Sequence, residues 1–253
     1  MENGMLLHEY KKISFRRPMV IVGFPSVGLV SSIAANFVVR SMKLERIATI
    51  LSPDFPPYAI VHEGVALPPV RIYAGQRQCD DQGEECEELI VVTSEFMPAP
   101  NLILPLVGTI LDWCKSNEAN TIVVLEGRNV GDAPEKHEIA AVATGEKCRK
   151  MLETYGLKEF KEGMVSGLSG VLLYEGERAG MDVICLLGPA RLDYPDARGA
   201  ARLIEHVAKM LPELKLDPEP LFKEAEGIEK EMKAAMESMR QQSRRPDESV
   251  LYG

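Results

Sequence analysis

The chain has 253 residues, 45% of them hydrophobic and 26% charged, with a formal net charge of −9 at pH 7. These values are typical of a soluble protein with one large domain, or with one domain and an appendage. The acidic excess argues against broad nucleic-acid binding, which needs a dense basic surface. No apolar run reaches the roughly 20 residues of a membrane-spanning helix, and Met1 to Tyr10 lack a secretory apolar core, so we expect a cytoplasmic protein without a membrane partner.

The first unit along the chain is a strand, a glycine-containing turn and a helix. Met19 to Val22 is a short apolar, β-branched run that predicts a buried strand, and the turn Gly23 to Gly28 follows it. Gly23 and Gly28 either allow a tight turn with close helix–sheet packing or, together with Ser26, hold a phosphate at the helix N-terminus. The turn lacks the spacing of the known nucleotide-binding glycine motifs, which favours the packing interpretation.

Further strands and helices alternate along the rest of the body. Each predicted strand is an apolar or alternating run bounded by turn residues, and each predicted helix carries apolar positions at helical spacing. The strands are expected at Ile47–Leu51, Tyr58–Val61, Val70–Tyr73, Leu89–Thr93, Thr121–Leu125 and Asp182–Leu187. The helices are expected at Leu29–Met42, Leu102–Ser116, Lys147–Thr154 and from Asp196, as the capping residue, through Met210.

Local features refine this prediction. Pro68-Pro69 before a strand suits the edge of a sheet, and Gln76 to Glu87 is a polar, acidic stretch expected to form a solvated loop. Asn101 is expected to cap the next helix, with Pro105 in its first turn. The glycine- and serine-rich stretch Gly163 to Gly170 predicts a tight loop before a packed element.

Alternating strands and helices predict a three-layer α/β/α sandwich, whose ligands usually lie at the carboxyl ends of the strands. Glu126 and Arg128 follow one strand and either clamp a substrate or form a local ion pair, which is the commoner arrangement. Neither Ser166 nor Ser169 fits a hydrolase nucleophile motif, and the histidines lack metal-ligand spacing. We therefore expect no enzyme activity, metal or cofactor. The polar residues expected at this edge are Ser26, Ser94, Glu95, Glu126, Arg128, Asn129, Ser166 and Ser169.

The cysteines are odd in number and include no C-x-x-C pair, which favours reduced thiols in a reducing compartment. Cys114 and Cys185 lie in apolar surroundings and are predicted to be core thiols. Cys79 and Cys86 lie in the polar stretch, where their spacing would permit a disulfide without requiring one.

The character of the chain changes after its first 214 residues, which we take as the core domain. Residues 215–242 are predicted to form an amphipathic helix that packs either on its own domain or on a neighbouring subunit. Residues 243–253 are predicted to be a flexible tail, because Pro246 cannot continue a helix. The apolar positions of the helix alternate four and three apart: Leu221, Ala225, Ile228, Met232, Ala235 and Met239.

The last three residues form a compact docking element. The Leu251 side chain can fill an apolar slot, the Tyr252 ring can pack while its hydroxyl bonds, and the Gly253 carboxylate can pair with a lysine. This ending resembles the hydrophobic-tyrosine-any-residue signature of proteins that insert their C-termini between α-subunits of the 20S proteasome. The alternative is a frayed terminus without a role.

The body resembles the proteasome assembly chaperone 2 family. The resemblance rests on Met19 to Gly28, Glu126-Gly127, Ala143-Thr144 and the Gly167-Leu168-Ser169-Gly170 segment before an expected strand, and it spans about Pro18 to Leu211. It implies an α/β/α fold similar to the purine nucleoside phosphorylase type, with a C-terminal helix and tail.

The resemblance also implies a role. A compact chain with this ending looks like the archaeal members, which are homo-oligomers that act without ATP in 20S proteasome assembly or activation. Leu251, Tyr252 and Gly253 would then be the residues that dock into the α-ring pockets. The alternative hypothesis is an enzyme, or a nucleotide- or nucleoside-binding protein, on a phosphorylase-like or ATP-grasp-like scaffold, using Gly23, Ser26 and Gly28.

Overall fold

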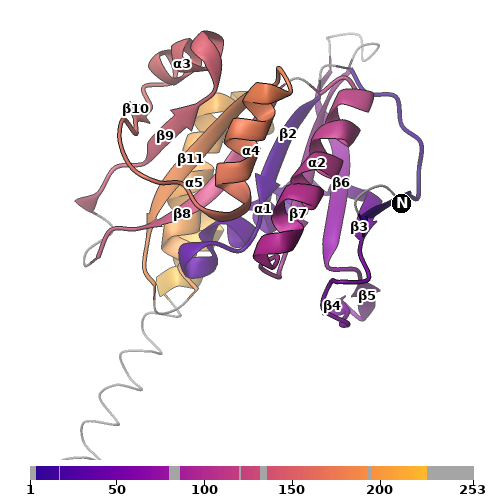
Figure 1. The fold of residues 1–253 in the computed structure, drawn as a ribbon. Helices are drawn as coiled ribbons and strands as arrows, with labels where there is room; N and C mark the ends of the chain where they lie inside the picture. The colour runs from indigo at the N-terminus through magenta and orange to yellow at the C-terminus, as the bar shows by residue number, and fades with distance from the viewer. Residues whose placement is uncertain are drawn as a thin grey trace, which may run out of the picture.

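The computed structural model describes residues 4–16, 18–79, 86–119, 121–131, 136–192 and 195–226. These residues form a central nine-stranded sheet with helices on both faces, which confirms the predicted three-layer α/β/α sandwich (Figure 1). A separate two-stranded hairpin lies beside the large sheet. Among these residues, no helix combines the length and the apolarity that crossing a membrane requires.

The strand order of the large sheet is β1-β3-β6-β7-β2-β8-β11-β9-β10, and β7, β2, β8 and β11 form a parallel centre. These central strands are apolar on both sides because helices cover both faces. The strands are β1 (Leu6–Glu9), β2 (Met19–Gly23), β3 (Glu45–Leu51), β6 (Val70–Cys79), β7 (Cys86–Ser94), β8 (Thr121–Asn129), β9 (Ala140–Ala143), β10 (Lys158–Glu159) and β11 (Asp182–Ala190), and the hairpin is β4 (Ile60–His62) with β5 (Val65–Leu67).

The helices form two layers. Helices α2 and α4 cover one face of the sheet, α1 and α5 cover the other, and buried residues of α3 belong to the α1 and α5 side (Figure 1). In β8, Ile122 and Val124 face α2 and α4 whereas Val123 and Leu125 face α1 and α5, as the two-residue period of a strand requires. The helices are α1 (Val30–Ser41), α2 (Pro100–Ser116), α3 (Gly145–Thr154), α4 (Gly167–Arg178) and α5 (Ala197–Met210).

The start of α5 follows the sequence prediction. Asp196 occupies the N-cap position, and its Oδ1 accepts a hydrogen bond from the Gly199 backbone N–H at 2.8 Å. The predicted core thiols Cys114 and Cys185 are buried, and Cys148 is a third buried thiol.

Strand boundaries near residue 76 differ from the prediction. Strand β6 lies between β3 and β7 rather than at an edge, because Pro68-Pro69 precede its first hydrogen-bonded residue and therefore remove no ladder bond. The stretch Gln76 to Glu87 is not wholly a loop, since β6 runs to Cys79 and β7 starts at Cys86. The side chains of both cysteines lie outside the described part, so their disulfide stays a prediction.

Two helix predictions are also corrected. Helix α2 starts at Pro100 with Ala99 as its N-cap, so Asn101 lies inside the first turn and Pro105 lies beyond it. Gly167 to Gly170 form the first turn of α4, and the apolar residues that follow are helical rather than a strand. A Cβ at Gly170 would lie 2.2 Å from the Val165 carbonyl oxygen, so this glycine allows a close backbone approach at the helix start.

The last described segment, which follows α5, packs against the body of the protein. Residues 219–226 are helical, and the N–H groups of Leu221 and Phe222 donate to the Pro218 carbonyl at 3.0 and 3.2 Å. Leu221 is buried in the same apolar cluster as α1 and α5. The proposed division at residues 214 and 242 stays a prediction, and residues 227–253 lie outside the described part.

Candidate functional site

The parallel strands bring several predicted polar residues to one edge of the sheet. Gly23 at the end of β2 is the register partner of both Thr93 in β7 and Leu125 in β8, so the segments that follow these strands lie next to one another. Ser26 bridges two of these segments. Its Oγ accepts a hydrogen bond from the Gly127 N–H at 3.0 Å and lies 2.5 Å from the Ser31 Oγ.

The turn from Gly23 to Gly28 is closely packed by the protein's own backbone. A Cβ at Gly23 would lie 2.5 Å from the Ser31 carbonyl oxygen, and one at Gly28, whose φ is 62°, would lie 2.6 Å from the Arg191 carbonyl oxygen. The Gly28 carbonyl accepts a hydrogen bond from the Asp196 N–H at 2.7 Å. This geometry favours close packing as the reason for the glycines, and the phosphate alternative stays a prediction.

Glu126 lies within β8 rather than after it, half-buried on the face covered by α2 and α4, where its carboxylate accepts a hydrogen bond from the Ser169 hydroxyl. Burial raises the pKa of Glu126 to about 7, and the hydrogen bonds from Ser169 and the Gly127 N–H oppose that rise. Burial, and after it the negative charge of Glu126, raises the pKa of the Cys185 thiol.

A carboxyl group with a pKa near neutrality can exchange a proton at physiological pH. The described contacts give it no catalytic partner, since the His206 ring lies on α5 against the opposite face, with Nδ1 2.9 Å from the Arg202 carbonyl.

Arg128 does not form the local ion pair with Glu126 that one of the two hypotheses required, and the substrate clamp stays a prediction. Its guanidinium lies over the Phe160 ring, 5.8 Å from the centroid, and its Nε is buried without a hydrogen-bond partner. The two residues lie two positions apart on β8, yet the described structure contains no ion pair between them. A cation over an aromatic ring is the arrangement found instead.

Glu95 takes part in a network that the sequence did not indicate. Its Oε1 accepts from Arg71, which is only 2% exposed, and from Asn36 Nδ2 at 3.2 Å. The Arg71 guanidinium also donates to the Tyr73 hydroxyl and to the Pro68 carbonyl, both at 3.0 Å. The sequence placed Glu95 at this edge but gave no sign of its partner Arg71 beyond a single charge inside an apolar strand.

The remaining predicted polar residues have local roles. Ser94 Oγ accepts a hydrogen bond from the Phe96 N–H at 3.1 Å, and Asn129 Oδ1 accepts one from the Gly131 N–H at 2.9 Å. Ser166 occupies the N-cap position of α4 without a side-chain bond to the helix. These residues close turns and offer no shared ligand geometry.

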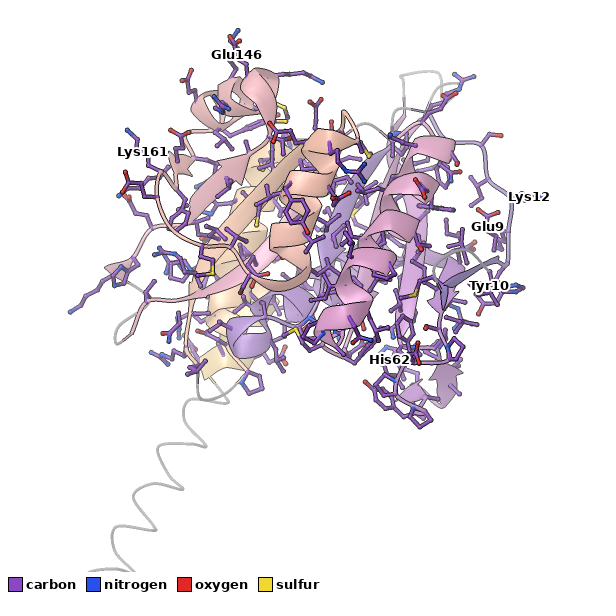
Figure 2. The ribbon with its side chains drawn as sticks, viewed as in Figure 1. Glu9, Tyr10, Lys12, His62, Glu146 and Lys161 are labelled. Carbon is purple, nitrogen blue, oxygen red and sulfur yellow. The ribbon has the colours of Figure 1, made fainter. Side chains whose placement is uncertain are left out.

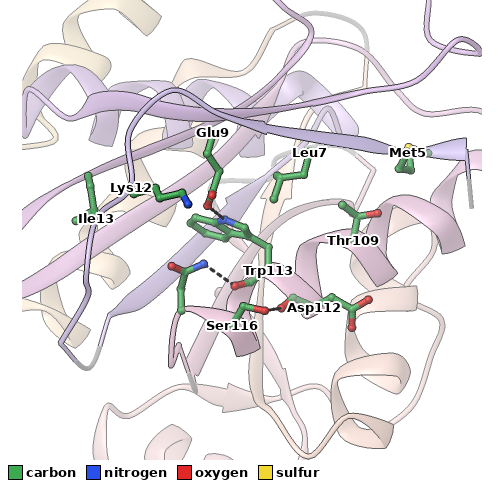
Figure 3. A pocket seen from close by; sticks show the side chains of 10 residues that line it. Met5, Leu7, Glu9, Lys12, Ile13, Thr109, Asp112, Trp113 and Ser116 are labelled. Carbon is green, nitrogen blue, oxygen red and sulfur yellow. Dashed lines mark hydrogen bonds between the residues drawn. The ribbon is translucent and has the colours of Figure 1, made fainter. Parts of the chain in front are cut away.

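A hollow of about 580 Å³ lies between the first strand and α2 (Figure 3). Its largest side chain, Trp113, donates from Nε1 to Glu9 Oε1 at 2.8 Å, which ties the N-terminal strand to the helix layer. Within the described residues, no group of three or more histidine, cysteine or carboxylate side chains is arranged to hold a metal ion.

The predicted docking residues Leu251, Tyr252 and Gly253 lie outside the described part of the chain. The described structure shows where the last residues before that part of the chain lie. Glu224 lines a small hollow of about 250 Å³ together with Leu29 and Arg40, so this last described segment lies beside α1.

The profile of the PAC2 family matches residues 20–236. The chain belongs to the PAC2 family. The uncharacterized protein MJ0106 of Methanocaldococcus jannaschii is 30% identical to it over 253 residues, which is all of both chains. The family resemblance predicted from the glycine and packing motifs is thereby confirmed.

Two solved structures of Pyrococcus furiosus proteins resemble this PAC2-family chain. PbaA, described as an archaeal homolog of proteasome-assembly chaperone, is 32% identical, with 98% of this chain and 100% of PbaA covered and a TM-score of 0.83. PbaB, described as an archaeal proteasome activator, is 23% identical, with coverage of 92% and 99% and a TM-score of 0.79. At that identity, the likeness to PbaB shows the fold alone.

Proposed function

We propose that this PAC2-family protein is a cytoplasmic, ATP-independent partner of the 20S proteasome. It acts as an assembly chaperone or an activator and docks Leu251, Tyr252 and Gly253 into pockets between α-subunits. The observation that carries the proposal is the full-length relation to PbaA, at 32% identity over the whole of that chain, combined with the tail chemistry of this sequence.

The body supports this proposal by acting as a scaffold. The polar groups at the carboxyl edge of the sheet bond to one another, as in the Ser26–Gly127 and Glu126–Ser169 contacts. The segment that leads to the tail starts from a buried anchor, since Leu221 and Ala225 are 1% and 3% exposed. A rigid start for this segment gives the tail a defined origin on the body.

Each tail by itself binds weakly, because ordering a peptide offsets much of its contact energy. We therefore propose a homo-oligomer that presents several tails to one α-ring. Linking several tails to one body raises their effective concentration and strengthens binding by about 10²–10⁴-fold.

The test is co-sedimentation of the full-length protein with purified 20S proteasome. We expect deletion of residues 251–253, and the substitution Tyr252→Ala, to abolish association without changing the oligomeric state measured by light scattering. Tyr174→Ala is the matched control, because Tyr174 is a tyrosine of α4 that is 55% exposed. Undiminished binding by the truncated protein would refute tail docking.

Peptide hydrolysis separates the two forms of the proposal. Faster hydrolysis by mature 20S particles in the presence of the protein identifies an activator. An effect confined to mixtures of unassembled subunits identifies an assembly chaperone.

The alternative function is an enzyme or a nucleotide- or nucleoside-binding protein, and one observation favours it: the carboxyl group of Glu126 has a pKa of about 7 and contacts the Ser169 hydroxyl. A thermal-shift screen against nucleosides and nucleotides tests it. A shift that disappears in Glu126→Gln or Ser26→Ala, with the fold retained, supports this function, and the absence of any shift counts against it.

A further inference from the structure

A hollow of about 420 Å³ lies between the β4–β5 hairpin and α1, over the start of β6. Its floor is the start of β6, and its walls are α1 and the hairpin. The volume is within the range of small-ligand pockets, which is roughly 300–1,000 Å³. Its lining includes Asn36, Arg40, Lys43, Ile60, Leu67 and Arg71.

The fold leaves this space open for a simple reason. The sheet extends past α1 through β6, β3 and β1, and the small hairpin lies below the end of β3, where it lines the hollow together with α1 (Figure 1). The hairpin turns at Glu63 and Gly64, whose φ angles are 48° and 78°. Its Ile60 and Leu67 are register partners, and both line the hollow.

The floor of the hollow is polar and fixed. Arg71 is bonded to Glu95, to the Tyr73 hydroxyl and to the Pro68 carbonyl, so its charge is compensated and its plane is held. Asn36 holds the same Glu95 oxygen from α1, at 3.2 Å. A ligand entering the hollow therefore meets groups that are already oriented.

The rim carries two cations, Arg40 and Lys43. The described structure contains no ion pair or side-chain hydrogen bond of Arg40 or Lys43, although the whole chain has a net charge of −9. These side chains are not needed to close α1, because backbone N–H groups already do so: Met42 N–H donates to the Val38 carbonyl at 2.9 Å and Leu44 N–H to the Val39 carbonyl at 3.0 Å.

We propose that this hollow binds a small organic anion, with a carboxylate or phosphate group held by Arg40 and Lys43 and an apolar body packed against Ile60 and Leu67. Arginine and lysine are the usual ligands of such groups, and their attraction is stronger beside apolar walls than in open water. The Glu95 carboxylate lines this hollow too, where it is paired with Arg71, and it borders the adjoining 250 Å³ hollow together with Glu224. The anion therefore sits at the Lys43 end, away from both carboxylates.

Saturation-transfer NMR and calorimetry on the full-length protein test the site with two anionic probes, 3-phenylpropionate and phenyl phosphate, and with the neutral 3-phenyl-1-propanol. We expect both anions to bind with a Kd of about 1 mM or tighter and the alcohol at least about tenfold more weakly. The ratio of the two anion affinities distinguishes a carboxylate site from a phosphate site.

The double variant Arg40→Gln/Lys43→Gln is expected to weaken anion binding by about tenfold or more while leaving the unfolding temperature unchanged. Arg149→Gln/Lys161→Gln is the matched control, since Lys161 lies across the molecule from His62 of the hairpin (Figure 2). Ile60→Trp fills the hollow and is expected to exclude both anions. Absence of anion binding to the wild-type protein, or equal binding by the Arg40/Lys43 variant, would overturn the proposal.

Discussion

Replacing Arg71 by methionine tests whether this buried arginine stabilises the contacts between Pro68, Tyr73 and Glu95. Methionine keeps the unbranched, apolar part of the side chain but removes every donor of the guanidinium. The change deletes the hydrogen bonds to the Tyr73 hydroxyl and the Pro68 carbonyl, and it leaves Glu95 without its cation. The lost bonds connect the end of the hairpin segment to β6 and β7, so the damage is expected there first.

The magnitude follows from the burial of the two partners. Breaking a buried ion pair costs about 3–5 kcal/mol, and a neutral hydrogen bond contributes about 1 kcal/mol. The Arg71 side chain is 2% exposed but that of Glu95 is 34% exposed, so water screens part of the unpaired charge. We therefore expect Arg71→Met to lower the free energy of unfolding by about 2–4 kcal/mol.

Urea denaturation followed by circular dichroism measures this change in the full-length protein. Adding Glu95→Gln to Arg71→Met should restore about 1–2 kcal/mol of the lost free energy of unfolding, because the second substitution removes the carboxylate that the first leaves without its cation. Lys11→Met is the control, since its ion pair with Glu45 is exposed and worth less than about 1 kcal/mol. A loss below about 0.5 kcal/mol for Arg71→Met, equal to that of the control, would contradict the reasoning.

Three further predictions concern other parts of the sheet edge. The raised pKa of Glu126, about 7, means that the folded protein holds a proton more tightly than the unfolded chain, so stability falls as pH rises from about 4.5 to 7 and stays low above it. Thermal unfolding against pH should show that Glu126→Gln flattens this slope and raises stability at pH 8. Gly23→Ala should lower the free energy of unfolding by about 1–3 kcal/mol, because the new methyl group would lie 2.5 Å from the Ser31 carbonyl oxygen. Urea denaturation measures this, and an unchanged unfolding midpoint contradicts it. Asp196→Ala should lower the free energy of unfolding in urea by about 1 kcal/mol, because the N-cap hydrogen bond of α5 is lost. Asp196→Asn keeps a side-chain oxygen that can accept this bond, so it should retain most of the stability.

The sequence predicted the layer architecture because the central strands are buried on both faces. Runs such as Val20 to Val22 and Ile122 to Leu125 have no polar residue to expose, and such strands occur where helices cover both sides of a parallel sheet. The strand ends were predicted less well. Strand β8 continues through Glu126 to Asn129 because β11 pairs with it along that whole length, a condition set by the neighbouring strand.

The polar contacts at the sheet edge were beyond prediction for a related reason. Arg71 meets Glu95 only because β6 and β7 pair in one particular antiparallel register, and Glu126 meets Ser169 only because α4 packs over β8. Neither pairing leaves a motif in the local sequence. The apolar residues after Gly170 were expected to form a strand, but packing against β11 holds them in helix α4.

The amino-acid sequence by itself determined the class of fold, the family resemblance and the chemistry of the Leu251-Tyr252-Gly253 ending, because each depends on residue types and spacings that are local. The tertiary structure was needed to show which polar side chains meet, how the glycines at 23 and 28 are used, and that a hollow lined by Arg40 and Lys43 opens beside the hairpin. Those outcomes depend on strand register and helix packing, which join residues far apart in the chain.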